Sequence, residues 1–299
     1  MTIREAAAQA SAKLKKAGIE NSSLDASLLL AHAVNTSRTA LIAAGPETLS
    51  NESFTAYRSL IERRLRGECT AYILEKKEFR GLEFLVNPSV LVPRPDTETL
   101  VEKAVEKLKE EKGKRKEKSG GKTAIDANHF YVLDLCTGSG AAAVAIKHEM
   151  PQIEVWAADI STDALKTAKI NAARLLPGDE PIHFLSGDLY AALPASGRQF
   201  SLIVCNPPYI PSGEIKKLSA DVQKEPLIAL DGGPTGLEII KRVIEGAPSY
   251  LIPGGELLLE ADPRQMQDIG ALLEENGFVR IKTYNDLSGR ERVIGGVYE

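Results

Sequence analysis

From residue 131 to residue 299, β-type segments alternate with helical segments, and this alternation constrains the fold more than any other feature of the chain. Short apolar runs of about four to eight residues that are bounded by turn signals are typical of buried strands. Strands that alternate with helices predict a largely parallel sheet with helices on both faces. We therefore expect an α/β fold with a mostly parallel, seven-stranded sheet. The strand candidates are YVLDL, EVWAAD, HFLSGD, SLIVC, ELLLEA, RIKTYN and RVIGGVY.

The region before this alternation has a different pattern. Residues 1–75 read as helices without a strand signal, and the first helix opens with a capping box formed by Thr2 and Glu5. Residues 76–95 mix β-formers with glycine and proline, which predicts a β-hairpin and an extended linker. We thus expect a small helical domain (1–75), a hairpin linker (76–95) and an α/β domain (96–299).

One stretch of the α/β domain departs from the alternating pattern. The sequence KGKRKEKSGGK (112–122) is highly charged and has no apolar periodicity. It can bury too little apolar area to offset the entropy lost on ordering. It is therefore predicted to be a solvated insertion.

Composition excludes several classes of function. The net charge of −4 and the pI near 5.8 predict no general attraction to nucleic acid or to anionic membranes. The three cysteines form no CxxC pair and the four histidines lie far apart, so neither a disulfide framework nor a metal site is indicated. The first residues contain no apolar run of the signal-peptide type. We expect a cytoplasmic, metal-free monomer that binds neither nucleic acid nor membrane.

The first strand of the α/β domain delivers a glycine loop, DLCTGSG (134–140), directly into a helix. Gly138 and Gly140 allow a tight turn and close approach of a ligand to the backbone. Asp159 ends the second strand, where a carboxylate can accept hydrogen bonds from ribose hydroxyls, and Asp188 ends the third. The third glycine of the dinucleotide fingerprint is an alanine here, and there is no phosphate-binding loop. An acid-rich, lysine-free pocket suits a positively charged ligand without phosphate, such as S-adenosylmethionine.

The fourth strand ends in CNPPYI (205–210), at the same edge of the predicted sheet as the glycine loop. Asn206 and Pro207 each precede a proline, which favours extended backbone, and proline has no N–H. The Asn206 side-chain oxygen and the Pro207 carbonyl oxygen could therefore accept both hydrogens of one planar –NH₂ group, on which the Tyr209 ring could stack. Such nitrogens are poor nucleophiles, and anchoring both hydrogens would hold the nitrogen in line with a methyl group. This predicts N-methyl transfer without a metal.

With DLCTGSG and NPPYI in this order, the chain resembles the release-factor glutamine methyltransferase family over nearly its whole length. Three further stretches carry the resemblance: LVPRPDTE (91–98), EPLIALDGG (225–233) and GRERV (289–293). The resemblance implies a Rossmann-like, class I S-adenosylmethionine-dependent methyltransferase with a helical substrate-recognition domain. It also implies methylation of the side-chain amide nitrogen of the glutamine in the Gly-Gly-Gln loop of peptide-chain release factors, with S-adenosylhomocysteine as product.

The resemblance also implies residue roles. Asn206 and Pro207 would be catalytic, and together with Pro208 and Tyr209 they would bind the glutamine amide. The implied cofactor-binding residues are Cys136, Thr137, Gly138, Ser139, Gly140, Asp159, Asp188, Leu189 and Asn206.

Three alternatives stay open. An exocyclic amine of a DNA or RNA base presents a similar flat –NH₂ group, but the chain is acidic and has no evident basic, aromatic target-recognition domain. Enzymes that act on a ribosomal-protein glutamine look similar but tend to carry Arg-Ser-Pro where this chain reads Arg94-Pro95-Asp96. The third alternative is a translation-factor binding module without turnover.

Two further residues have competing interpretations. Arg94 either reaches the cofactor or the substrate, or pairs with Asp96 or Glu98. Glu225 lies in the long segment 210–235, which we expect to form a lid, and it is interpreted as an anchor of that lid rather than as a base.

Overall fold

The computed structural model describes residues 1–118, 130–178, 182–195 and 197–299. The chain divides into two compact units. The helical unit comprises Met1–Lys76 together with Ser219–Lys224. The sheet unit comprises Lys77–Leu218 and Glu225–Glu299.

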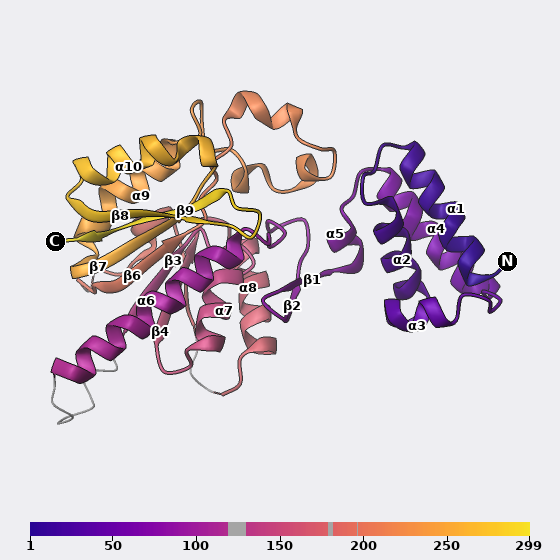
Figure 1. Ribbon diagram of the computed structural model, residues 1–299, viewed down its shortest axis with the longest axis horizontal. Helices are drawn as coiled ribbons and strands as arrows, with labels where there is room; N and C mark the ends of the chain where they lie inside the picture. Colours follow the sequence, from indigo (N-terminus) through magenta and orange to yellow (C-terminus); the bar gives the residue numbers. More distant parts are fainter. Residues whose placement is uncertain (119–129, 179–181, 196) are drawn as a thin grey trace. The chain divides into compact units, whose positions relative to one another are not determined.

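The helical unit packs its helices around one apolar core (Figure 1). Its helices are α1 (Ile3–Lys16), α2 (Ser22–Ala33), α3 (Arg38–Ala43), α4 (Asn51–Leu65) and the short α5 (Thr70–Leu74). The capping box is present at the start of α1, where the Thr2 hydroxyl accepts from the Glu5 N–H and the Glu5 carboxylate accepts from the Thr2 N–H. The sequence did not single out α5 as a helix of its own.

A buried arginine holds the distant segment Ser219–Lys224 in the helical unit. Arg64 on α4 is 8% exposed. Its guanidinium pairs with Asp25 of α2 at 2.7 Å and with Asp221 at 3.3 Å. A buried guanidinium requires such carboxylates, because an unpaired charge is costly to remove from water.

A two-stranded hairpin of β1 (Lys76–Phe79) and β2 (Leu82–Leu85) follows. Arg80 and Gly81 at its tip both have positive φ, 48° and 73°. Two such residues form the turn whose twist matches that of paired strands. The hairpin packs Phe79 edge-to-face on Phe84.

The sheet unit contains the predicted seven-stranded sheet, and the predicted α/β class is confirmed. The strand order is β5-β4-β3-β6-β7-β9-β8; β9 runs antiparallel to both of its neighbours, β7 and β8, and the other neighbouring strands are parallel. The strands are β3 (Tyr131–Leu135), β4 (Glu154–Asp159), β5 (His183–Ser186), β6 (Phe200–Cys205), β7 (Leu251–Glu260), β8 (Phe278–Asn285) and β9 (Glu291–Tyr298).

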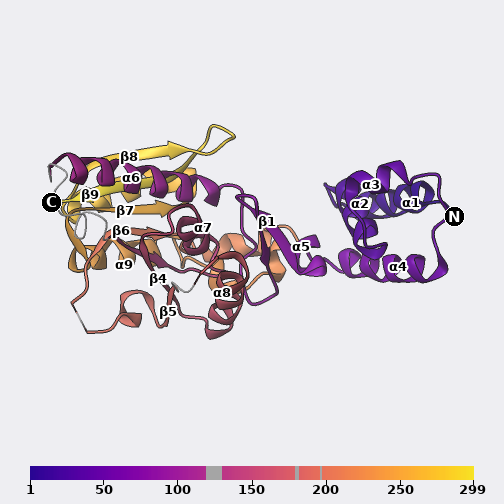
Figure 2. The same ribbon diagram turned by 90° about the horizontal axis from the view of Figure 1, so that it is seen from below.

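Helices cover both faces of this sheet (Figure 1). The first face carries α6 (Thr97–Lys118), α7 (Ala141–Glu149) and α8 (Thr162–Leu175), and the second carries α9 (Glu238–Gly246) and α10 (Met266–Glu275). Figure 2 shows α6 running alongside β7 and β9. Short 3₁₀ helices connect these elements: η2 (Leu189–Ala192), η3 (Ser212–Lys217), η4 (Val222–Lys224), η5 (Leu227–Ala229), η6 (Ala247–Ser249) and η7 (Pro263–Gln265).

Strand periodicity explains the two cores. Val132 faces α7, whereas its neighbour Leu133 lies in the core beneath α9 and α10. Successive side chains of a strand point to opposite faces, so a sheet covered on both faces needs apolar residues at nearly every position.

Helix α6 is longer than expected. The solvated insertion was predicted to begin at residue 112, whereas α6 continues to Lys118. Lys, Arg and Glu have high helix propensity, which explains why charge alone does not end the helix. The rest of the charged stretch 112–122 lies outside the described residues.

Candidate active site

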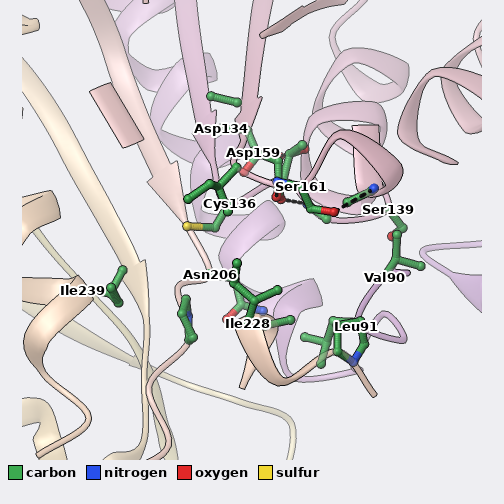
Figure 3. A pocket seen from close by; sticks show the side chains of 18 of the residues that line it. Val90, Leu91, Asp134, Cys136, Ser139, Asp159, Ser161, Asn206, Ile228 and Ile239 are labelled. Atoms are coloured by element: carbon green, nitrogen blue, oxygen red, sulfur yellow. Dashed lines mark hydrogen bonds between the residues drawn. The ribbon is translucent and has the colours of Figure 1, made fainter. Parts of the chain in front are cut away.

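A cavity of about 690 Å³ opens where β3, β4 and β6 end. In the parallel register Leu135 is paired with both Ala158 and Cys205, so the three chains leave the sheet at one edge. The volume lies within the range of about 300–1,000 Å³ that is typical of small-molecule sites. Figure 3 shows Asp159 and Ser139 on one side of this cavity and Asn206 and Ile228 on the other.

Most of the predicted site residues lie together in its wall. Those that line the cavity are Cys136, Thr137, Gly138, Ser139, Asp159, Asp188, Leu189, Asn206 and Pro208. Gly140, Pro207 and Tyr209 adjoin them in sequence but are not among the lining residues.

The glycine loop is fixed by Asp159. Its Oδ2 accepts a hydrogen bond from the Gly138 N–H and its Oδ1 one from the Ser161 N–H, both at 2.8 Å. Gly138 and Gly140 have φ of 57° and 80°. Burial raises the pKa of Asp159, and the N–H donors oppose that rise. The carboxylate thus shapes the loop, whatever else it binds in the cavity.

A second acid beneath the loop escaped the sequence analysis. Asp134 in β3 is 2% exposed, and its Oδ2 accepts from the Thr137 hydroxyl at 2.6 Å and from the Ala143 N–H at 3.1 Å. Burial raises its pKa to about 7. The signal was available, since an aspartate within an otherwise apolar strand must find buried donors.

Two arginines also line the cavity, so it is free of lysine but not of cations. Arg242 on α9 donates to Asp188 at 2.7 Å, and both side chains are about half exposed. Arg94 pairs with Glu225, not with Asp96 or Glu98. Each arginine therefore forms an ion pair: Arg242 with Asp188, which also lines the cavity, and Arg94 with Glu225, which precedes the cavity residues 226–229.

Glu225 acts as the predicted anchor. It is 5% exposed, and its carboxylate accepts from the Val92 N–H at 3.0 Å and from the Arg94 guanidinium at 2.5 Å. The residues that follow, 226–229, form part of the cavity wall. Leu227 and Ile228 are 59% and 54% exposed, so this wall presents apolar side chains.

The chain after β6 brings Asn206 and Pro208 into the cavity wall. The Asn206 Nδ2 donates to the Thr97 hydroxyl at 3.2 Å. This bond uses one of the two N–H donors of the amide, and no protein donor in the described ranges hydrogen-bonds Oδ1, so that oxygen can accept from a ligand. No donor in the described ranges hydrogen-bonds the Pro207 carbonyl. Thr97 was not singled out from the sequence, because it lies 109 residues before Asn206 along the chain.

The end of this segment is held by its neighbours. The Tyr209 carbonyl accepts from Gln265 Nε2 at 3.0 Å, and the Tyr209 side chain packs partly on the core beneath α9 and α10. Burial raises the pKa of Tyr209. A Cβ added at Gly232 would lie 2.7 Å from the Pro208 carbonyl oxygen, so only glycine allows this approach. The stacking role of Tyr209 stays a prediction.

Two searches of the described residues found nothing further. They contain no group of three or more His, Cys, Asp or Glu residues placed to hold a metal ion. None of the helices in those ranges has the length and hydropathy needed to cross a membrane.

Fold and site together define a class I methyltransferase. The family model "Methyltransferase small domain" matches residues 123–224. The solved structure of a methyltransferase from Pyrococcus furiosus has a similar fold, with a TM-score of 0.51 at 16% identity over 79% of this chain and 96% of that one.

The similarity to curated proteins is closer and covers both units. The model "PrmC N-terminal domain" matches residues 5–74. The release factor glutamine methyltransferases of Burkholderia pseudomallei and Geobacter sulfurreducens are 40% and 34% identical to the chain, over 91% and 99% of it and 91% and 96% of their own length. The chain therefore belongs to the release factor glutamine methyltransferase family and is an S-adenosylmethionine-dependent enzyme.

Proposed function

We propose that this protein transfers a methyl group from S-adenosylmethionine to the side-chain amide nitrogen of the glutamine in the Gly-Gly-Gln loop of peptide-chain release factors. Family membership supports the reaction. The observation that carries the proposal is the orientation of Asn206, whose nitrogen is bonded to Thr97 so that its oxygen is available at the cavity.

The substrate amide needs two acceptors. Its nitrogen lone pair is delocalised, so it is a weak nucleophile unless it is held in the reacting geometry. Asn206 Oδ1 and the Pro207 carbonyl oxygen accept one hydrogen each and favour the positive charge that the nitrogen acquires as it bonds to the methyl carbon. Positioning of this kind contributes up to roughly 7–11 kcal/mol to lowering a barrier. After transfer the nitrogen loses one proton, and the amide is neutral again.

The cavity residues fit the cofactor. When bound, S-adenosylmethionine supplies an electrophilic methyl group on a sulfonium. Asp159 would hold the ribose hydroxyls, while Cys136, Gly138 and Leu189 would line the rest of the site. The space beside Gly138 is open, since no heavy atom lies within 4 Å of a Cβ added there. No metal takes part, and S-adenosylhomocysteine is the product.

The proposal also assigns the partner. The helical unit, with residues 1–75, would recognise the body of the release factor, because a pocket for one amide cannot select one glutamine among many. The protein would act as a monomer in the cytoplasm, where translation terminates, without binding nucleic acid or membrane directly.

One assay tests this function. The purified protein and labelled S-adenosylmethionine are offered a release factor, its variant with alanine for the loop glutamine, duplex DNA and ribosomal RNA. We expect label on the release factor and none on the alanine variant. Label on DNA or RNA but not on the release factor would contradict the proposal, and no transfer to any of them would favour a binding module.

A further inference from the structure

The cavity residues 226–229, here called the apolar wall, carry large apolar side chains that are exposed. Leu227 and Ile228 are 59% and 54% exposed, and both line the cavity. Figure 3 shows Ile228 on the same side of the cavity as Asn206, with Asp159 on the other side. Adjoining apolar side chains that stay exposed at a pocket indicate contact with a ligand. The apolar wall therefore lies where a ligand bound at Asn206 would extend.

One end of the apolar wall is held by the chain that follows β6. The Ile210 N–H donates to the Leu230 carbonyl at 3.0 Å, and the Gly232 N–H donates to the Ile210 carbonyl at 2.9 Å. Ile210 and Asp231 accordingly form a parallel bridge. Ile210 is the last residue of the segment CNPPYI, which also contains Asn206. These bonds therefore fix the apolar wall relative to Asn206.

The other end of the apolar wall is held by Glu225. Its buried carboxylate accepts from the Val92 N–H at 3.0 Å and from the Arg94 guanidinium at 2.5 Å. Removing one partner of such a buried pair is costly, so the pair holds its two segments together. The segment that it binds also contributes Leu91 and Arg94 to the cavity. The apolar wall is thus held at both ends, and the positive charge of Arg94 is already neutralised.

We propose that Leu227 and Ile228 are specificity-determining residues that select a glutamine preceded by glycine. The side-chain amide of a glutamine is only a few bonds from its backbone. When the amide is bound at Asn206, the adjoining substrate backbone therefore passes the apolar wall. Glycine has no Cβ and allows this close approach, whereas any other residue would press a side chain against a wall that is held at both ends. This inference rests on the proposed function and assigns the residues that recognise the loop sequence.

The test compares two substrates that differ by one methyl group: a release factor, and its variant with alanine for the glycine before the loop glutamine. The wild-type kcat/KM should be at least about tenfold lower for the alanine variant, as one added carbon can be in a close-fitting site. In the double variant Leu227→Ala/Ile228→Ala the two values should come within about threefold of each other, because the alanine substrate gains room. The KM for the cofactor should stay within about threefold of wild type.

A matched control and the fold of the variant make the result decisive. Ile170→Ala truncates another exposed isoleucine, on α8, that is not among the cavity-lining residues, and it should keep the wild-type ratio. Since Leu227 and Ile228 are more than half exposed, their truncation should leave stability near wild type.

Two results would overturn the inference. A wild-type enzyme that methylates both substrates equally well would show that no glycine is selected. A double variant that keeps the wild-type ratio would show that the preference comes from elsewhere, such as the conformation of the loop itself; if its affinity for S-adenosylhomocysteine also falls in calorimetry, the apolar wall contacts the cofactor instead. A wild-type enzyme that methylates neither substrate would contradict the proposed function.

Discussion

At the scale of single residues, the account depends on where two oxygen atoms point. Asn206 lines the cavity, and its Nδ2 donates one hydrogen bond to the Thr97 hydroxyl. Pro207 contributes its backbone carbonyl, which any residue would carry. The two residues should therefore respond differently to truncation.

Asn206→Ala should lower kcat by at least about 10³-fold, because it removes an acceptor that acts mainly on the transition state. Pro207→Ala keeps the carbonyl and should cost no more than about tenfold. Asn285→Ala, on the exposed edge of β8, serves as the matched control. Calorimetry should show cofactor affinity within about threefold of wild type in all three. Near-normal turnover by Asn206→Ala would contradict the assigned role.

At the scale of elements, the two glycines of the loop between β3 and α7 should affect different properties: Gly140 the stability of the fold, and Gly138 the binding of the cofactor. Both glycines have positive φ, so an alanine at either position is strained by about 1–2 kcal/mol. A Cβ at Gly140 would lie 3.1 Å from the Ala168 Cβ on α8, whereas one at Gly138 meets nothing within 4 Å and faces the cavity.

Gly140→Ala should therefore lower the free energy of unfolding by about 2 kcal/mol or more, since strain and crowding add. Gly138→Ala should cost about 1 kcal/mol in stability but should weaken cofactor binding more than Gly140→Ala does. Denaturant titration and calorimetry on the pair measure both quantities. The opposite order of effects would show that the loop does not contact the cofactor as proposed.

The sequence predicted the features that depend on residues close together in the chain, and it missed those that depend on residues far apart. Strand patterns and the Thr2 capping box depend on local residues, and the seven strands were found. The contacts that support the site join residues far apart in the sequence: Glu225 with Val92, and Asn206 with Thr97. Such pairs are created by the register of β6 and β7 and by the start of α6, and no local pattern reveals them.

At the scale of the whole molecule, buried acids should shape the response to pH. Since the pKa of Glu260 is raised to about 7 from 4.5, the group favours the folded state below about pH 4.5, and this contribution is lost as pH rises to about 7. Glu260→Gln does not titrate. Its free energy of unfolding should thus rise relative to wild type by on the order of 3 kcal/mol between pH 4.5 and 7.

Fluorescence of Trp156 measures this effect in the sheet unit. It is the one tryptophan of the sequence and lies 9% exposed in β4. Denaturant unfolding of both proteins at pH 5 and pH 8 gives the difference. A difference that stays constant between these two pH values would contradict a raised pKa for Glu260.

The helical unit gives a second prediction at this scale. Deleting residues 1–75 should raise KM for the intact release factor by at least about tenfold, because contacts with the body of the factor are lost. KM for a short Gly-Gly-Gln peptide should change far less. Asp221→Asn in the full chain controls for loss of the Arg64 ion pair, which the deletion also removes. Equal changes for both substrates would argue against a recognition role.

The most direct test of the central claim is a crystal structure of the enzyme with S-adenosylhomocysteine and a Gly-Gly-Gln peptide. The account predicts the glutamine amide nitrogen within hydrogen-bonding distance, about 3 Å, of both Asn206 Oδ1 and the Pro207 carbonyl oxygen, and facing the sulfur. A glutamine bound elsewhere, or an Asn206 whose –NH₂ faces the substrate while Thr97 binds its oxygen, would contradict it.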